Sequence, residues 1–426
     1  MQAVQNFFWR LSAHPAVRYF DQFRPNARLF LLATVISGIT FSGFQLFFNI
    51  YLKSRGLDLD FIGLLNAIPS TAALIVGVPM GLLSDRIGQR RAMLIGLAVA
   101  TLGAYGLVAS ESRFMMVVMS AIMGVANSLY FLSLAPFMMS ASGEKERTLL
   151  FSLNFGLTTL SGAVGNLVAG QLPGWFGAWL GVGVESAPAY QAVLAASILG
   201  GGLALVPTWL IREARWPGPP AHPPVGLKEL GHLIRPGVLR MAVPNIIIGF
   251  GAATLIPYLA LFFKGQFAVD DSSLGGLYSL GAITTGLATV IGPRLAEGLG
   301  GKIKTIVVTQ GISIFFLLII GFAPVFWMSG GAFLVRSALM NMSNPLYSAF
   351  AMEQTPERER AAVNSVMALM WEVGWAVGPY LSGVVQARWG FAPLFISTAV
   401  LYTLAIGLTW LFFRDKETEP VGQLAG

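Results

Sequence analysis

Cysteine is absent from the 426-residue chain, and charged residues are scarce. Without a thiol there is no disulfide framework, no thiolate nucleophile and no cysteine-ligated metal. Only 11% of the residues are charged, where a soluble domain has roughly 25%. The three histidines (His14, His222 and His232) lie outside the apolar runs. These deficits argue against a membrane enzyme such as an acyl or glycosyl transferase, which would use His, Cys or clustered acids at an interface.

Long apolar runs account for most of the sequence. Hydrophobic residues make up 55% of the chain, and the mean hydropathy is +0.69. A membrane-spanning helix needs about 20 apolar residues, and twelve runs of that kind predict an all-α membrane protein with twelve transmembrane helices. Their expected limits are Arg28–Leu52, Phe61–Leu83, Ala92–Ser110, Phe114–Met139, Leu149–Gly170, Pro188–Ile211, Met241–Phe263, Ser273–Gly292, Thr305–Ala323, Gly330–Met352, Ala361–Val385 and Ala392–Phe413. The apolar run Trp175–Val184 is too short to span, and we expect a loop or a re-entrant stretch there.

Lysine and arginine are distributed unevenly among the predicted loops. With the N-terminus in the cytoplasm, 21 of the 27 lysines and arginines fall in cytoplasmic segments and five in the opposite loops. This asymmetry predicts that both termini are cytoplasmic, in an inner (plasma) membrane of the bacterial type. The net charge of +7 then reflects topology, and no nucleic-acid partner is expected. Residues 1–27 lack the pattern of a signal peptide; they are either an amphipathic helix at the cytoplasmic interface or a tail.

A proline-rich segment divides the chain into halves. Residues 212–240 hold five basic residues and a cluster of prolines, which forbid a continuous helix. We expect a cytoplasmic linker here. It would join an N-terminal six-helix bundle at 28–211 to a C-terminal one at 241–413, and residues 414–426 would form a cytoplasmic tail.

The two halves repeat at an offset of about 212 residues. The segment Ile62-Gly63-Leu64-Leu65 corresponds to Leu274-Gly275-Gly276-Leu277, and Gly170 corresponds to Gly383. Farther toward the N-terminus, Tyr51-Leu52-Lys53 corresponds to Phe262-Phe263-Lys264. Their shared order predicts two pseudo-symmetric bundles related by an axis along the membrane normal.

A charged turn separates the second and third apolar runs, where hydrocarbon could not accommodate it. It reads Gly81-Leu82-Leu83-Ser84-Asp85-Arg86-Ile87-Gly88-Gln89-Arg90-Arg91. The pattern Gly-x-x-x-Asp-Arg-x-Gly-x-Arg-Arg resembles the signature loop of the major facilitator superfamily, and the likeness extends from Arg28 to Phe413. The resemblance implies two six-helix bundles around a central cavity that opens alternately to each side. The second copy of the turn is degenerate, with Gly298 in the place of Arg86.

The resemblance also implies a gating role for this turn, through Asp85. Its carboxylate would hold the cytoplasmic ends of the bundles together by meeting the start of the eleventh helix, just after Arg360. By the repeat, Glu297 would face the start of the fifth helix, just after Arg147. The alternative is that both carboxylates are solvated loop charges. The predicted gating residues are Gly81, Asp85, Arg86, Gly88, Arg90, Arg91 and Glu297.

Two ionisable residues stand within predicted spans: Arg336 in the tenth and Glu372 in the eleventh. A charge at membrane depth is costly and marks a functional site by default. The two residues lie roughly 25 and 18 Å from the cytoplasmic face at 1.5 Å per residue, so an ion pair is feasible. Either this pair is static and locks the C-terminal bundle, or Glu372 exchanges a proton or contacts the substrate.

Polar and aromatic residues near mid-helix are the remaining candidates for a central cavity. As a set they favour an amphiphilic or uncharged organic substrate, because a phosphate or dicarboxylate would need several buried cations. For any one aromatic residue, packing or lipid contact is the alternative. The candidates are Phe41, Phe44, Gln45, Asn127, Asn154, Thr158, Asn245, Tyr258, Asn344, Trp371 and Trp375.

Some features depart from those of antiporters in the resembling family. Their Gly-x-x-x-Gly-Pro motif in the fifth helix is matched here only in the eleventh, by Gly374 to Pro379. The fourth helix has no embedded arginine, since Arg113 lies at its outer edge. Both departures weaken a drug-antiporter interpretation.

These patterns together predict a secondary active transporter that binds a small-molecule substrate, and protons with it, within the lipid bilayer. No Gly-x-x-x-x-Gly-Lys-Ser/Thr loop is present, so ATP is not the expected energy source and no cofactor is expected. Proton-coupled export comes first; proton-linked metabolite uptake and a lipid flippase on the same scaffold are the alternatives. Nothing in the sequence demands more than a monomer.

Overall fold

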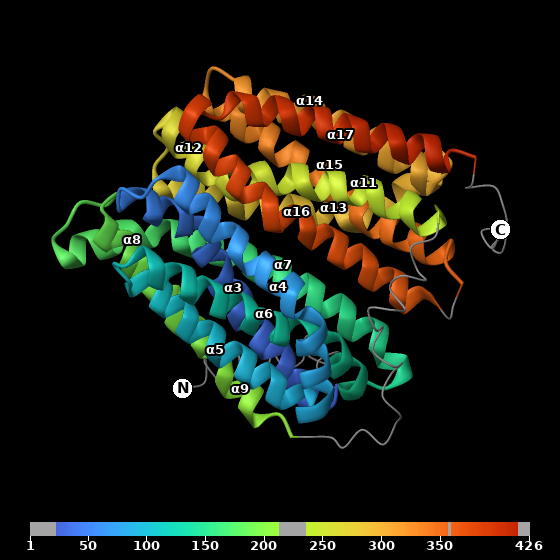
Figure 1. Cartoon of the computed structure of the whole chain (residues 1–426), viewed down its shortest axis with the longest axis horizontal. Helices are drawn as coiled ribbons and strands as arrows, with labels where there is room; N and C mark the ends of the chain where they lie inside the picture. Colours follow the sequence, from blue (N-terminus) through green and yellow to red (C-terminus); the bar gives the residue numbers. More distant parts are fainter. Residues whose placement is uncertain (1–22, 213–235, 357–358, 416–426) are drawn as a thin grey trace, which may run out of the picture.

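The computed structural model describes residues 23–212, 236–356 and 359–415, and within these ranges it is helical and free of strands. Two bundles lie side by side (Figure 1). The helices of the first half are α3 (Pro25–Ser54), α4 (Leu59–Ile87), α5 (Gln89–Ala109), α6 (Arg113–Ala141), α7 (Glu144–Leu180), α8 (Ala187–Gly202) and α9 (Leu205–Leu210).

The second half repeats this order. Its helices are α11 (Pro236–Leu255), the 3-10 turn η1 (Ile256–Tyr258), α12 (Leu259–Phe267), α13 (Asp271–Leu299), α14 (Lys302–Phe322), α15 (Phe326–Glu353), α16 (Arg360–Trp389) and α17 (Ala392–Phe413). The pair α8–α9 is the predicted sixth span, and α11, η1 and α12 together are the seventh. The twelve-helix prediction is therefore confirmed, and nine stretches of the described residues, including the joined spans Ala187–Leu210 and Pro236–Phe267, are long and apolar enough to cross a membrane.

Several predicted helix limits differ from the structure, and two of these differences change an interpretation. The fifth helix does not end near Gly170, because α7 continues through Pro173 to Leu180 and closes with Gly181 in the left-handed conformation (φ 67°). The run Trp175–Val184 is therefore largely the last part of a helix rather than a loop. At 37 residues, α7 is roughly 55 Å long, so its end extends beyond a hydrocarbon core of about 30 Å. The last five residues of the predicted linker, 236–240, belong to α11; the rest of that linker and the N-terminal segment 1–22 lie outside the described residues.

The Asp85–Arg91 turn takes its shape from one glycine. Gly88 ends α4 and begins α5 with a φ of 88°, a conformation that a side chain disfavours. Its N–H donates to the carbonyl of Ser84 and its carbonyl accepts from Ala92, so the turn satisfies both helix ends. We call the end of the molecule that carries this turn the basic end. The opposite end carries the α3–α4 and α12–α13 connections.

Helix α13 begins at the opposite end with a carboxylate cap. Asp270 accepts a hydrogen bond from the backbone N–H of Ser273 at 2.8 Å. Its hydrogen bonds with Ser273 hold the pKa of the Asp270 carboxyl below its ordinary value. The cap is therefore ionised at neutral pH, and its contribution is lost only as the pH falls through that lowered pKa.

The two bundles meet through pairs of glycines near the opposite end. An added Cβ at Gly275 of α13 would come within 2.6 Å of the carbonyl of Asn166 on α7, and one at Gly170 within 2.8 Å of the carbonyl of Asp271. The α4–α16 contact repeats this arrangement, with Gly63 against Pro379 and Gly383 against Leu59. Gly63 and Gly275, like Gly170 and Gly383, are the pairs that the sequence repeat relates, so one packing device is used twice.

We expect Gly275→Ala to force α7 and α13 apart at the opposite end. The new Cβ would meet backbone, which cannot rotate away, and overpacking of this kind costs about 1–3 kcal/mol. In a chain with Gln171→Cys as its only thiol, the labelling rate with a membrane-impermeant reagent should rise by roughly 5-fold or more. Gly276→Ala is the matched control, since its Cβ would meet nothing within 4 Å. Equal labelling rates in the two variants would contradict this account.

Candidate substrate and gating site

The α7–α13 and α4–α16 contacts end near the middle of the helices. On α4, Thr71 still reaches the carbonyl of Ala376 at 3.4 Å, but an added Cβ at Gly77 would meet nothing within 4 Å. On the other side, Gly286 of α13 lies against Thr159 of α7, and beyond it Gly156 is open. The bundles are thus joined from the opposite end to mid-depth. In Figure 1 the ribbons of the two bundles diverge toward the basic end.

The eleventh-helix candidates stand where the bundles part. Glu372 and Trp375 lie within a turn of Ala376 on the basic-end side, and both are half-buried. Trp371 packs its ring on Gly249 of α11. The indole N–H of Trp375 is buried without a hydrogen-bond partner among the described residues. We call this segment of α16 together with residues 154–158 of α7 the central zone.

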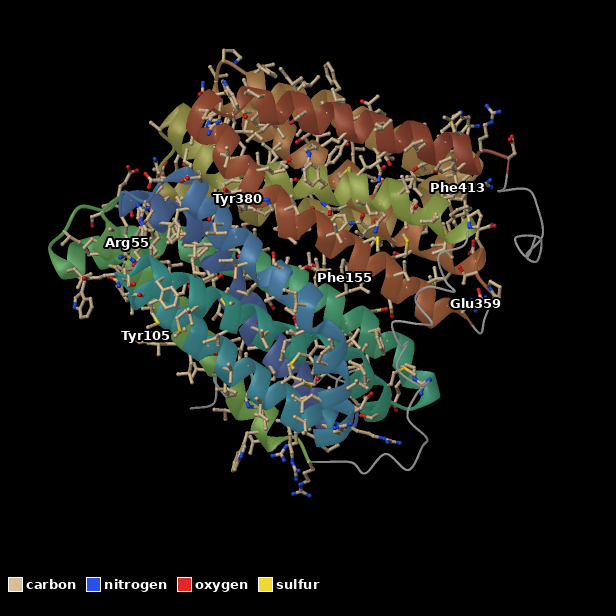
Figure 2. All side chains as sticks on the ribbon, in the orientation of Figure 1. Arg55, Tyr105, Phe155, Glu359, Tyr380 and Phe413 are labelled. Carbon is tan, nitrogen blue, oxygen red and sulfur yellow. The ribbon has the colours of Figure 1, made fainter. Side chains whose placement is uncertain are left out.

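On α7 the central zone presents polar and aromatic side chains. Phe155 is 57% exposed and lies between the bundles in Figure 2. Thr158 is exposed and donates to the carbonyl of Asn154. Asn154 itself accepts from Thr34 of α3 at 3.1 Å, which fixes its amide to the N-terminal bundle. Gln45 of α3 is exposed.

The other amide candidates are bonded within their own bundle or make no side-chain hydrogen bond with another described residue. Asn245 donates to the carbonyl of Met367 at 3.2 Å, which joins α11 to α16. Asn344 is exposed and donates to Asn341 one turn away. Asn127 is half-buried. Phe44 and Tyr258 are 9% and 0% exposed and belong to the hydrophobic core, so including them among the cavity residues was wrong.

Arg336 does not pair with Glu372. Its side chain is 4% exposed and donates to the hydroxyl of Tyr402 on α17 at 3.2 Å, with the guanidinium 5.8 Å from that ring's centroid. No ion pair forms between Arg336 and Glu372 in the described part of the chain. Arg336 therefore holds α15 to α17, and Glu372 is a half-buried acid without a cation beside it.

The predicted gating carboxylates make no hydrogen bond or ion pair across the bundles among the described residues. Asp85 and Glu297 are exposed, and neither makes a side-chain bond to a described residue. Arg360 donates instead to the carbonyls of Met352 and Thr355 within its own bundle. Arg90 donates to the carbonyl of Trp209 at 2.6 Å and so ties the turn to α9. Among the other gating residues, Gly81 would tolerate a Cβ, Gly88 shapes the turn, and Arg86 and Arg91 are exposed.

One charged cluster was missed. Asp271 is 4% exposed, and its carboxylate receives Lys264 at 2.6 Å and the hydroxyl of Tyr190 at 3.1 Å. Lys264 also reaches Glu185 at 2.9 Å. Lys264 and Asp271 each lie just beyond a predicted apolar run. The sequence therefore indicated a loop between two spans for both, not a buried pair.

Comparison with known proteins agrees with this architecture. The family model described as Major Facilitator Superfamily matches residues 30–252 and 241–426. One relative is the Escherichia coli K12 protein called uncharacterized MFS-type transporter YdeE. It is 22% identical over 93% of this chain and 95% of its own. A homologue of the multi-drug resistance efflux pump PmrA from Lactococcus lactis is 28% identical, but the match spans 41% of this chain and 44% of the relative. Thus the chain spans about half the length of the curated relatives that it matches first.

Among solved structures, a bacterial homologue of the human lysosomal transporter Spinster has the same fold. It superposes with a TM-score of 0.76 at 15% identity, over 91% of this chain and 96% of that one. The nucleoside transporter NupG superposes with a TM-score of 0.70 at 13% identity, over 91% and 99% of the two chains. With the family model matching both halves, the chain belongs to the major facilitator superfamily, a multi-pass membrane fold.

Proposed function

We propose that the protein exports a small amphiphilic or uncharged organic solute by alternating access. One observation carries this proposal: among the described residues, the close contacts between the bundles run from the opposite end to mid-depth, and the gating carboxylates at the basic end make no side-chain bond. With the basic end in the cytoplasm, as the charge asymmetry predicts, this is the inward-facing state. The Spinster homologue that shares the fold was also solved in an inward-facing conformation.

The central zone suits an apolar or amphiphilic solute. Its described side chains are mainly aromatic and hydroxyl or amide groups, with Glu372 as its acid. Arg336 is already engaged with Tyr402, so the zone has no cation ready for a multiply charged anion. Export is supported by the names of relatives: the Lactococcus protein is called an efflux pump homologue, and a Bacillus subtilis relative, 24% identical over 78% of this chain, is called a methylenomycin A resistance protein.

The basic end closes, in this proposal, through the Asp85 turn. When the bundles swing together, Asp85 approaches the start of α16, and Glu297 approaches the start of α7. A carboxylate at a helix N-terminus gains roughly 0.3–1 kcal/mol from the helix dipole. Contacts of that size hold a gate and still release it during the cycle.

Proton coupling is assigned to Glu372. A carboxyl group that stands between two bundles, with no cation beside it, can bind a proton in one state and release it in the other. In this proposal the proton and the solute share one zone, because Glu372 adjoins Trp371 and lies about one helical turn from Trp375. Binding of one would then alter binding of the other.

Expression in a bacterial host stripped of its own efflux pumps should confer resistance to some members of a panel of amphiphilic toxic compounds. Asp85→Asn should reduce that resistance, because the basic end loses a charged contact when it closes. Glu111→Gln, an exposed acid in the α5–α6 connection, is the control and should keep full resistance. No resistance across the panel, with the protein present in the membrane, would contradict export and direct the next assay to nutrient accumulation.

Replacement of Glu372 tests the coupling. In vesicles with an imposed pH gradient, Glu372→Gln should bind substrate but lose the stimulation of transport by the gradient. Asp60→Asn changes an exposed acid of α4 and should leave the pH dependence as in the wild type. If Glu372→Gln transport kept the wild-type pH dependence, the proton site would have to be elsewhere.

A further inference from the structure

The structure contains a buried charged cluster that spans the two bundles at the opposite end. Lys264 and Asp271 belong to the C-terminal bundle, and Glu185 and Tyr190 belong to the N-terminal one. The side chains of Lys264 and Asp271 are 12% and 3% exposed. We call these four residues the Asp271 cluster.

Two bonds of this cluster cross between bundles. The hydroxyl of Tyr190 lies 3.2 and 3.1 Å from the two carboxylate oxygens of Asp271. Lys264 Nζ lies 2.9 Å from Glu185 Oε1 and 5.7 Å from the centroid of the Tyr190 ring. The Tyr190 ring stacks on Phe47 of α3 with centroids 5.6 Å apart, so its hydroxyl moves with the N-terminal bundle.

Packing alone does not require these charges, because the molecule closes the same kind of contact without them. Gly170 approaches the backbone of Asp271, and its repeat partner Gly383 approaches the backbone of Leu59. The apolar Leu59 thus stands in the α4–α16 contact where Asp271 stands in the α7–α13 contact. Lys53, which the repeat relates to Lys264, is exposed.

We propose that the Asp271 cluster is an electrostatic lock that holds the opposite end closed and sets how readily it opens. The α7–α13 contact then controls the opening, and the α4–α16 contact separates as a consequence. This deepens the alternating-access function proposed above and rests on it. Opening separates Tyr190 and Glu185 from the C-terminal bundle, while Lys264 and Asp271 stay together on their own side.

The cluster acts as a lock because its central charges, Lys264 and Asp271, are buried, whereas Glu185 at its edge is 64% exposed. A buried carboxylate stripped of one partner is strongly destabilised, whereas replacing both members of a buried pair by apolar groups is often neutral. Removal of a single member therefore penalises the closed state, in which the remaining charge is buried, more than the open state, in which water reaches it. Removal of both leaves an apolar contact like the one at Leu59.

Distances between two spin labels, measured by double electron–electron resonance, test the lock directly. The absence of native cysteine makes the labelling simple. One label replaces Glu111 in the α5–α6 connection and the other replaces Val325 before α15, both exposed and at the opposite end. Tyr190→Phe should raise the ratio of long to short distances by roughly 10-fold, the effect of losing one hydrogen bond to a charged group. Lys264→Met should raise it at least as much.

The double variant Lys264→Met/Asp271→Leu should return the distances toward those of the wild type, because it reproduces the apolar arrangement at Leu59. Asp58→Asn is the control: it removes an exposed ion pair with Arg113, 2.8 Å long, at the same end but within one bundle. Its distances should match those of the wild type.

The outcomes separate the lock from the transport function. If the wild type opens at this end on addition of a transported compound but Tyr190→Phe and Lys264→Met leave the populations unchanged, the lock is wrong and alternating access stands. A wild type whose opposite end never opens, with or without such a compound, contradicts the proposed function itself. Distances in the double variant that match those of Lys264→Met alone would also overturn the lock.

Discussion

Close backbone contact between helices of different bundles is the constraint on which the rest of the structure depends. Gly63, Gly170, Gly275 and Gly383 leave no room for a side chain where they meet the facing helix. In a membrane, where lipid tails are as apolar as leucine, such small-residue packing is a main source of helix association. Because such contacts are short-range, a small rotation of one bundle would break them, as the alternating-access proposal requires.

Polar groups are added to this packing in an asymmetric way. Asn49 of α3 donates to the carbonyl of Pro257 at 2.7 Å, beside the break between α11 and α12, and receives Asn66 at 2.7 Å. Gln171 of α7 donates to Ser272 at 2.6 Å. The Asp271 cluster lies next to that last bond. The α7–α13 contact is thus supplemented by the Gln171–Ser272 bond and the nearby Asp271 cluster, whereas the α4–α16 contact depends mostly on shape, with Thr71 reaching the carbonyl of Ala376 at 3.4 Å.

The sequence predicted the fold well, because its strongest signals are those that membranes impose. Twelve apolar runs, one proline-rich break and a repeat of about 212 residues gave the helices and their pairing. Helix ends were less predictable: Pro173 lies inside α7 and does not end it. A proline within a helix is tolerated when neighbouring groups satisfy the freed carbonyl, and sequence alone does not show those neighbours.

The candidate site was predicted only in part, because the sequence indicates how deep a residue lies along its helix but not the direction in which its side chain points. Glu372, Trp371 and Trp375 were placed correctly near the middle of the eleventh helix, but the direction in which Arg336 points depends on Tyr402, 66 residues away. Lys264 and Asp271 were treated as loop charges because they lie one and two residues outside the expected spans. The repeat contained a usable signal, because its offset of about 212 residues relates the charged Asp271 to the apolar Leu59.

Cross-linking of the opposite end tests the central claim, that transport requires the two bundles to part there. Gln171 and Ser272 contact each other across the bundles, so a Gln171→Cys/Ser272→Cys chain can be joined by oxidation or by a short thiol-specific cross-linker. Our account predicts that joining them abolishes transport of any compound the protein exports, that reduction of the disulfide restores it, and that Ser272→Cys alone is unaffected by the same treatment. Full transport by the cross-linked chain would contradict alternating access through this end.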